Sequence, residues 1–131
     1  MGAILLRRDR VLLVERGKSP LKGYWSLPGG VLETGERLRE GIAREVLEET
    51  GLIVKPLQVI EIFERIMRDE KGIPEYHYVL IDYLCRVTGG ALAPADDVSR
   101  AEWVPRDSLR NYKITEGTLL VIQKAFRERG V

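Results

Sequence analysis

The first thirty residues alternate between apolar runs and polar breaks, as short strands and their turns do. Apolar stretches at 2–7 and 11–16 flank a short polar turn, and this pattern predicts a β-hairpin. A loop with proline and two lysines follows over 17–23. The stretch Trp-Ser-Leu-Pro-Gly-Gly at 25–30 then ends in two glycines, which predict a sharp break before the next element.

An amphipathic helix is expected after this break. Leu38, Ile42 and Val46 recur every four residues, as on the buried stripe of a helix. We therefore expect a helix from about 37 to 50, with Gly51 at the position of a C-cap glycine. The apolar stripe should pack on the domain, while the acidic side of the helix should face outward.

The rest of the chain reads as strands followed by a closing helix. The segment 53–68 is β-rich, 69–72 is expected to be a hairpin turn, and 76–87 reads as a long strand. Three further elements follow: a strand at 101–104, a helical turn at 105–111 and a helix at 115–129. The order β-β-α-β-β-β-α predicts an α+β fold with a mixed sheet between helices.

Composition narrows the class of protein. A chain of 131 residues, 44% hydrophobic and 31% charged, suits one domain over 1–131 with a real core. A net charge of +1 gives no reason to expect a nucleic-acid partner, and no apolar run is long enough to span a membrane. The N-terminus lacks the pattern of a signal peptide, and Cys85 is the single cysteine. We therefore expect a cytoplasmic protein with a buried thiol.

Three carboxylates share one face near the end of the predicted helix. Glu45, Glu48 and Glu49 are spaced so that their Cβ atoms lie roughly 5–6 Å apart. Like charges at this spacing destabilise a helix, and the negative end of the helix dipole favours basic residues instead. Arg44, four residues before Glu48, is the only basic neighbour positioned to offset this repulsion. A helical turn whose residues go against several local stability preferences indicates that these residues serve a function.

The acidic cluster lies within the stretch GVLETGERLREGIAREVLEETGL, residues 30–52. This stretch resembles the signature box of the Nudix (MutT-like) hydrolases. The flanking segments at 25–30 and 102–105 are also similar to that family, and nearly the whole chain fits one such domain. Every defining position of the box is filled, by Gly30, Glu36, Arg44, Glu45, Val46, Glu48, Glu49, Gly51 and Leu52.

The resemblance implies the Nudix fold, an α/β/α sandwich in which the box forms a loop–helix–loop. It also implies hydrolysis of a nucleoside diphosphate linked to another group, with Mg²⁺ or Mn²⁺ as cofactor. Both expectations suit the acidic cluster, because Mg²⁺ prefers oxygen ligands and a divalent cation offsets repulsion among carboxylates. By position in the box, the expected metal ligands are Glu45, Glu48, Glu49 and the backbone carbonyl of Gly30.

Catalysis is expected to involve Glu48 and Glu45, and the family often adds a carboxylate from a later loop as base or extra ligand. Asp97 is the first choice for that group, Asp96 the second and Glu102 the third. An ordinary loop turn is the alternative interpretation of Asp97, and a base supplied by the box glutamates alone also stays open.

Substrate contacts are less well defined by the sequence. A basic group near the substrate phosphates would help to bind them, and Arg16 and Arg65 are candidates. A base could stack on Trp25, for which a core role is the alternative. Three box residues are expected to be structural: Glu36 and Arg44, which in the family help to fix the loop against the helix, and the C-cap Gly51.

The box indicates the reaction rather than the leaving group. The strand from 76 to 83, with Asp97 and the segment at 102–103, is similar to small members grouped with ADP-ribose pyrophosphatases. This similarity favours a nucleotide sugar such as ADP-ribose, cleaved to AMP and a sugar phosphate. Hydrolysis of a (deoxy)nucleoside triphosphate and a non-catalytic sensor are the alternatives. We expect a small nucleotide as partner and no membrane or nucleic acid; a homodimer could form through exposed apolar residues at 53–66.

Overall fold

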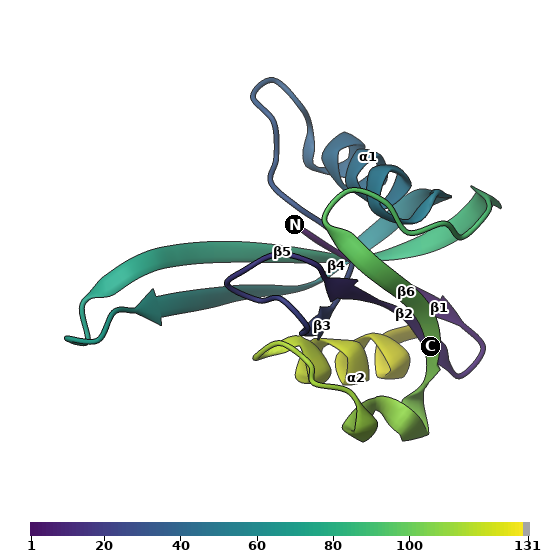
Figure 1. Ribbon diagram of the computed structural model, residues 1–131. Coiled ribbons are helices and arrows are strands. Elements are labelled where there is room, and N and C mark those ends of the chain that lie inside the picture. Colours follow the sequence, from purple (N-terminus) through teal and green to yellow (C-terminus); the bar gives the residue numbers. More distant parts are fainter. Residues whose placement is uncertain (130–131) are drawn as a thin grey trace.

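The computed structural model describes residues 1–129, and Figure 1 shows a sheet between two α-helices with a long two-stranded arm. Within these residues, neither α-helix is long and apolar enough to cross a membrane. The elements in chain order are β1 (Gly2–Arg7), β2 (Arg10–Arg16), β3 (Trp25–Ser26), α1 (Leu38–Thr50), β4 (Leu52–Arg68), β5 (Pro74–Gly90), β6 (Val98–Pro105), the 3-10 helix η1 (Arg106–Asn111) and α2 (Thr118–Arg129).

The six strands form one mixed sheet. Strand β2 is antiparallel to β1, β3 and β6, and β5 is antiparallel to β4. The pair β1–β5 is parallel, from Gly2 opposite Asp82 to Leu5 opposite Cys85. The predicted α+β fold with a mixed sheet is therefore confirmed.

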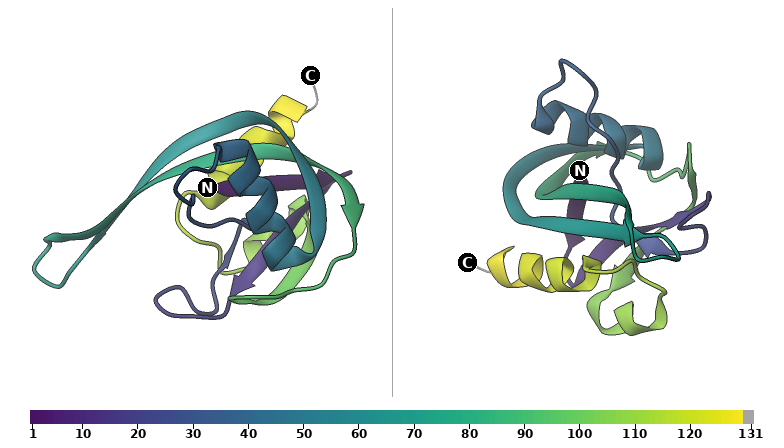
Figure 2. Two further views of the ribbon diagram at one scale, coloured as in Figure 1. Left: turned by 90° about the horizontal axis from the view of Figure 1, so that it is seen from above. Right: turned by 90° about the vertical axis from the view of Figure 1, so that its left-hand side faces the viewer.

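Alternation along the strands divides the core into two layers, one under each helix, and Figure 2 shows the helices on opposite faces of the sheet. Ile42 and Val46 of α1 are fully buried, as their spacing predicts. Cys85 is also buried, in the same layer. The layer under α1 includes Ala3, Leu5, Leu12, Leu52 and Tyr83, and the layer under α2 includes Ile4, Val11, Leu13, Ile122 and Phe126.

The closing helix begins later than expected, at Thr118 rather than Thr115. The backbone N–H of Thr115 donates to the carbonyl of Trp25, and Ile114 forms a β-bridge with Trp25, so the chain is still extended there. The hydroxyl groups of Thr115 and Thr118 lie 2.7 Å apart and hydrogen-bond to each other across the start of the helix. The tertiary contact with β3 therefore delays the helix.

Strands β4 and β5 are 17 residues each and reach far beyond the body of the sheet (Figure 1). Strand β1 meets β5 only between Asp82 and Cys85, so residues 62–81 form a two-stranded ribbon. We call this ribbon the arm. Its predicted turn at 69–72 is present, with the Gly72 N–H donating to the Asp69 carbonyl.

Gly51 ends α1 in the left-handed conformation, with φ of 77° and its N–H donating to Leu47. A Cβ atom at this position would lie 2.4 Å from the carbonyl oxygen of Ala91, which belongs to a neighbouring backbone. We expect Gly51→Ala to lower the free energy of unfolding by about 2–4 kcal/mol, since it adds a backbone clash to the cost of a positive φ. Urea unfolding followed by circular dichroism measures this loss.

Gly72→Ala is the matched control, because Gly72 has φ of 78° and no atom within 4 Å of its Cβ position. It should cost only the conformational part, about 1 kcal/mol. Equal losses in the two variants would show that the contact with Ala91 contributes nothing.

Candidate active site

The guanidinium group of Arg44 gathers the carboxylates of the box. Its Nε donates to Glu36 at 2.6 Å, and its Nη1 donates to Glu45 at 3.0 Å and to Glu48 at 3.1 Å. The hydrogen bond from Arg44 lowers the pKa of Glu36, and the pKa of Arg44 is raised in turn. Arg44 thereby connects the loop that carries Glu36 to the acidic turn of α1.

Glu49 differs from the other two box carboxylates because it is buried, with 5% of its surface exposed. One carboxylate oxygen accepts from the backbone N–H of Gly29, and the other accepts from Arg16, both at 2.9 Å. The expectation that the whole acidic side faces outward is therefore wrong for Glu49. It fails because the loop containing Gly29 folds back over the end of α1.

Arg16 holds several parts of this region together. Besides Glu49, its guanidinium donates to the hydroxyl of Ser26 at 2.8 Å and to the carbonyl of Leu27 at 2.9 Å. These contacts join β2, the end of β3 with the residue after it, and the C-terminal turn of α1. Arg16 also lines a cavity beside this region, so its position is compatible with a substrate contact as well.

Gly30 lies directly against Glu45. A Cβ atom at Gly30 would lie 2.4–2.6 Å from the carboxylate atoms of Glu45, so a larger residue here would displace that carboxylate. The carbonyl of Gly30 accepts a hydrogen bond from the amino group of Met1 at 2.8 Å. Burial raises the pKa of Glu45, and nearby Glu49 and Glu48 also raise it, against the opposing effect of Arg44.

The donor set around Gly30 consists of oxygen atoms, which suits a hard divalent cation. Cationic groups already approach these oxygens: Arg44 contacts both Glu45 and Glu48, and the Met1 amino group contacts the Gly30 carbonyl. Within residues 1–129, no three acidic, histidine or cysteine side chains are already gathered into a metal cage. The residues therefore fit a divalent cation in chemistry, and the carboxylates would have to turn from Arg44 toward it.

A cavity of about 590 Å³ opens beside this cluster. Its lining runs from Gly29 and Gly30 to the base of the arm, and the lining is largely apolar. The volume is in the range of small-ligand sites. The side chains on its wall include those of Arg16, Leu27, Arg65, Met67, Tyr78 and Leu80.

Arg65 lies on the cavity wall, as expected for a candidate that contacts substrate. Its Nη2 donates to the carbonyl of Glu116 at 2.8 Å. Its buried Nε has no hydrogen-bond partner among the described residues.

Trp25 and Asp97 lie away from the cavity wall. Trp25 is buried in the core, packs edge-on against Tyr112 and has Arg100 over its ring, so we assign it to the core. Asp97 makes an exposed ion pair with Lys18 at 2.8 Å. The loop before Asp97 is tied to the end of α1, because the Ala95 N–H donates to the Glu49 carbonyl.

Sequence reasoning missed two residues that the fold brings to this region. Tyr78 lines the cavity, and its ring stacks on that of Tyr76 with centroids 6.0 Å apart. Asp82 is buried next to Gly2 at the parallel β1–β5 contact. The alternation along 76–82 places Tyr76, Tyr78 and Asp82 on one face, but only the pairing of β5 shows what that face meets.

Burial raises the pKa of Asp82 from 3.8 to about 6. Because the folded-state pKa lies above the unfolded one, this group favours the fold fully below about pH 4 and progressively less up to about pH 6. The free energy of unfolding should therefore decrease by about 2–3 kcal/mol between about pH 4 and pH 6 because of Asp82. We expect Asp82→Asn to remove this decrease. Urea unfolding at several pH values from 4 to 7 measures it.

Asp9→Asn, at an exposed aspartate in the β1–β2 turn, is the control and should leave the pH dependence unchanged. A wild-type slope retained in Asp82→Asn would contradict the assignment of the decline to Asp82.

The family comparison covers almost the entire chain: the NUDIX domain matches residues 1–124. Among curated relatives, the ADP-ribose pyrophosphatase of Methanocaldococcus jannaschii is 36% identical over 109 residues, 83% of this chain and 62% of that protein. The mouse 8-oxo-dGDP phosphatase NUDT18 is 34% identical over 113 residues, 83% of this chain and 32% of that protein. The chain thus spans less than two thirds of these relatives.

Solved structures of similar proteins agree with the fold. The MutT NUDIX hydrolase from Burkholderia pseudomallei has a TM-score of 0.81 at 25% identity, covering 94% of this chain and 93% of that one. The NUDIX domain of Shewanella oneidensis NrtR, solved in complex with ADP ribose, has a TM-score of 0.76 at 25% identity, covering 99% and 86%.

Proposed function

Because this chain belongs to the Nudix hydrolase family, we propose that it cleaves the pyrophosphate bond of a nucleotide sugar such as ADP-ribose. Water would add to one phosphorus, the P–O bond of the bridge would break, and the products would be AMP and a sugar phosphate. We further propose a small-molecule substrate in the cytoplasm, no membrane or nucleic-acid partner, and a homodimer.

One observation carries this proposal: the acidic turn of α1 and Gly30 lie at one end of a largely apolar cavity that contains two arginines. A nucleotide sugar has a charged pyrophosphate at its centre and an aromatic base at one end. The charged centre suits the end near Gly30 and Arg16. The base suits the wall formed by Leu80 and the exposed ring of Tyr78.

We propose that Glu45, Glu48, Glu49 and the carbonyl of Gly30 hold Mg²⁺ or Mn²⁺ in the active enzyme. When bound, this ion supplies Lewis acidity that activates water and offsets charge on phosphate oxygens. Both oxygens of Glu49 already have partners, but each keeps a second lone pair for a ligand role.

The remaining residues of the cluster are proposed to position these ligands. Arg44 and Glu36 keep the loop against α1, since their contact at 2.6 Å bridges the two segments. Gly51 allows α1 to end directly after the ligand-bearing turn. Arg65 is proposed to contact the substrate, because it lies on the cavity wall.

Asp97 is our proposed general base. We expect Asp97→Asn to lower kcat about 10²-fold at neutral pH, with the acidic limb of the pH–rate profile lost. The nearby Asp96→Asn is the matched control and should retain most of the activity. An unchanged profile in Asp97→Asn would reduce Asp97 to a loop residue paired with Lys18.

The direct test of the reaction is an assay of candidate substrates with Mg²⁺ and, separately, with Mn²⁺. The set holds ADP-ribose, other nucleotide sugars, dinucleotides and nucleoside triphosphates, with the products separated and identified. Preferential cleavage of ADP-ribose to AMP supports the proposal. Nucleotide binding by calorimetry without any cleavage would instead support the sensor role.

A second candidate is hydrolysis of a nucleoside di- or triphosphate, including one with an oxidised base. The similarity to the 8-oxo-dGDP phosphatase NUDT18 favours it. Release of inorganic pyrophosphate or phosphate from such nucleotides, at a kcat/KM above that for ADP-ribose, would select this candidate.

A further inference from the structure

The arm is a ribbon with two free edges. Strand β4 is the last strand of the sheet, and β5 meets β1 only from Asp82 onward. Throughout the part of the chain that the structure describes, no third strand pairs with residues 62–81. Isolated two-stranded ribbons are marginally stable in water, and free strand edges readily pair with other chains.

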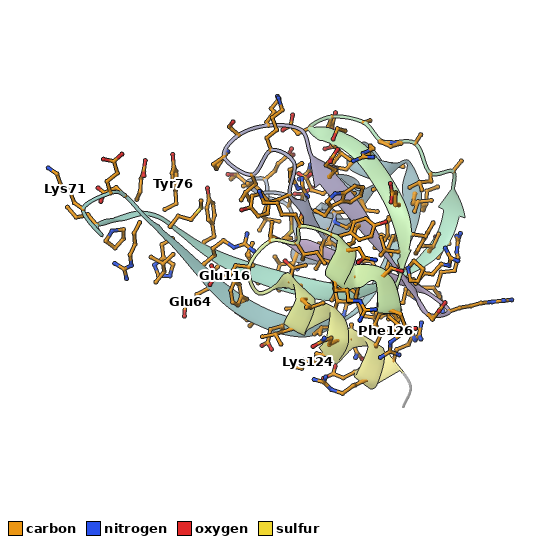
Figure 3. All side chains as sticks on the ribbon, turned by 60° about the horizontal axis from the view of Figure 1, so that its bottom comes forward. Glu64, Lys71, Tyr76, Glu116, Lys124 and Phe126 are labelled. Atoms are coloured by element: carbon orange, nitrogen blue, oxygen red, sulfur yellow. The ribbon has the colours of Figure 1, made fainter. Side chains whose placement is uncertain are left out.

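One face of the arm packs on the body near the base of the arm, and the opposite face is open. Phe63 lies against Gly117, and Arg65 donates to Glu116, so this inner face meets the start of α2. The opposite face carries Ile62 and Val79, which are 61% and 59% exposed. Figure 3 shows the arm reaching away from the body, with Lys71 at its tip and Glu64 and Tyr76 along it. We call the open face the outer face; it consists of Ile62, Glu64, Ile66, His77 and Val79.

The charge pattern of this face is self-complementary. Glu64 and His77 sit on opposite strands with their side chains 2.8 Å apart, and apolar residues surround this pair. Across a twofold axis, Glu64 of one copy can meet His77 of the other and the reverse, as an isologous contact requires. The whole arm holds four acidic residues against three basic ones, so it offers no strong field to an oppositely charged partner.

We propose that the outer face of the arm is the contact surface of a homodimer, in which it packs on the same face of a second copy. Pairing covers Ile62, Ile66 and Val79, and it places the neighbouring arm beside each ribbon. This surface is the contact between the two copies of the homodimer named under the proposed function. The proposal does not depend on which bond the enzyme cleaves.

The contact also affects the cavity. Val79 belongs both to the outer face and to the cavity lining, and Arg65, Met67 and Tyr78 of the arm line the cavity as well. A partner arm packed at Val79 would therefore order one wall of the substrate site. Monomeric variants should show a higher KM with a smaller change in kcat, because the acidic turn of α1 lies on the body.

The test is sedimentation velocity of the full chain over about 1–100 µM, without substrate. Wild type should sediment with twice the chain mass. Ile62→Lys/Val79→Lys should be monomeric, with a dissociation constant raised at least about 100-fold. Both positions are exposed, and thermal unfolding monitors the fold; Ile62→Ser/Val79→Ser serves as a milder pair with the same expected direction.

Leu120→Lys is the matched control, since Leu120 is an exposed apolar residue of α2 away from the arm. It should remain dimeric. If the wild type is a monomer at 100 µM, the proposal that a second copy binds the outer face is wrong, and the partner of this face would be a different protein. Dissociation by Leu120→Lys, or a dimer that survives both arm pairs, would overturn the choice of surface. Because mass is measured without turnover, these results are separate from the test of hydrolysis.

Discussion

Glu48→Gln is expected to lower kcat at least about 10³-fold while the protein stays folded. Glu48 is the most exposed of the three box carboxylates, with 44% of its side chain accessible, and its only described contact is with Arg44. Glutamine keeps the length of the side chain but removes the anionic oxygen that a divalent cation needs. The free energy of unfolding should change by less than about 0.5 kcal/mol, the value of an exposed i,i+4 ion pair.

Glu33→Gln is the matched control for this experiment. Glu33 also approaches Nη1 of Arg44, at 3.5 Å, but it sits in the loop and is 67% exposed. Its replacement should leave kcat within about twofold of wild type. Near-normal turnover in Glu48→Gln would remove Glu48 from the metal site. A comparable loss in both variants would mean that neutralising any partner of Arg44 is enough to disturb the site.

The predictable parts of this fold are those set by local periodicity. Ile42 and Val46 were placed in the core by spacing alone, and α1 begins and ends within one residue of the predicted bounds. The start of α2 was not predictable in this way, because a contact between Thr115 and Trp25 keeps the chain extended. Such long-range contacts override local helix propensity.

The same distinction applies to the site. The box spacing placed Glu45 and Glu48 on one helix face, but the burial of Glu49 depends on Gly29 folding back over α1. Likewise, the alternation of β5 predicts which residues share a face with Tyr78, and the cavity beside it exists only because the arm passes the loop at 26–32. Sequence patterns therefore specify ligands within one element better than contacts between elements.

The interaction of Arg16 with Glu49 should contribute strongly to stability. Arg16→Met removes three hydrogen bonds and leaves Glu49, 5% exposed, with a charge paired only to the Gly29 N–H. Removing one partner of a buried ion pair is strongly destabilising, and since a fifth of the Arg16 side chain is exposed, we expect a loss of about 3 kcal/mol. Urea unfolding of the variant measures it.

Glu49→Gln in the Arg16→Met background separates a buried charge from lost packing. If the unpaired carboxylate causes the instability, the double variant should recover about 1–2 kcal/mol relative to Arg16→Met alone. If lost contacts with Ser26 and Leu27 dominate, the second substitution should recover nothing. Arg16→Lys keeps the positive charge without the planar fork that reaches three acceptors, so it should fall between wild type and Arg16→Met. Recovery in the double variant would identify Arg16 as the residue that balances the charge of Glu49, one of the proposed metal ligands.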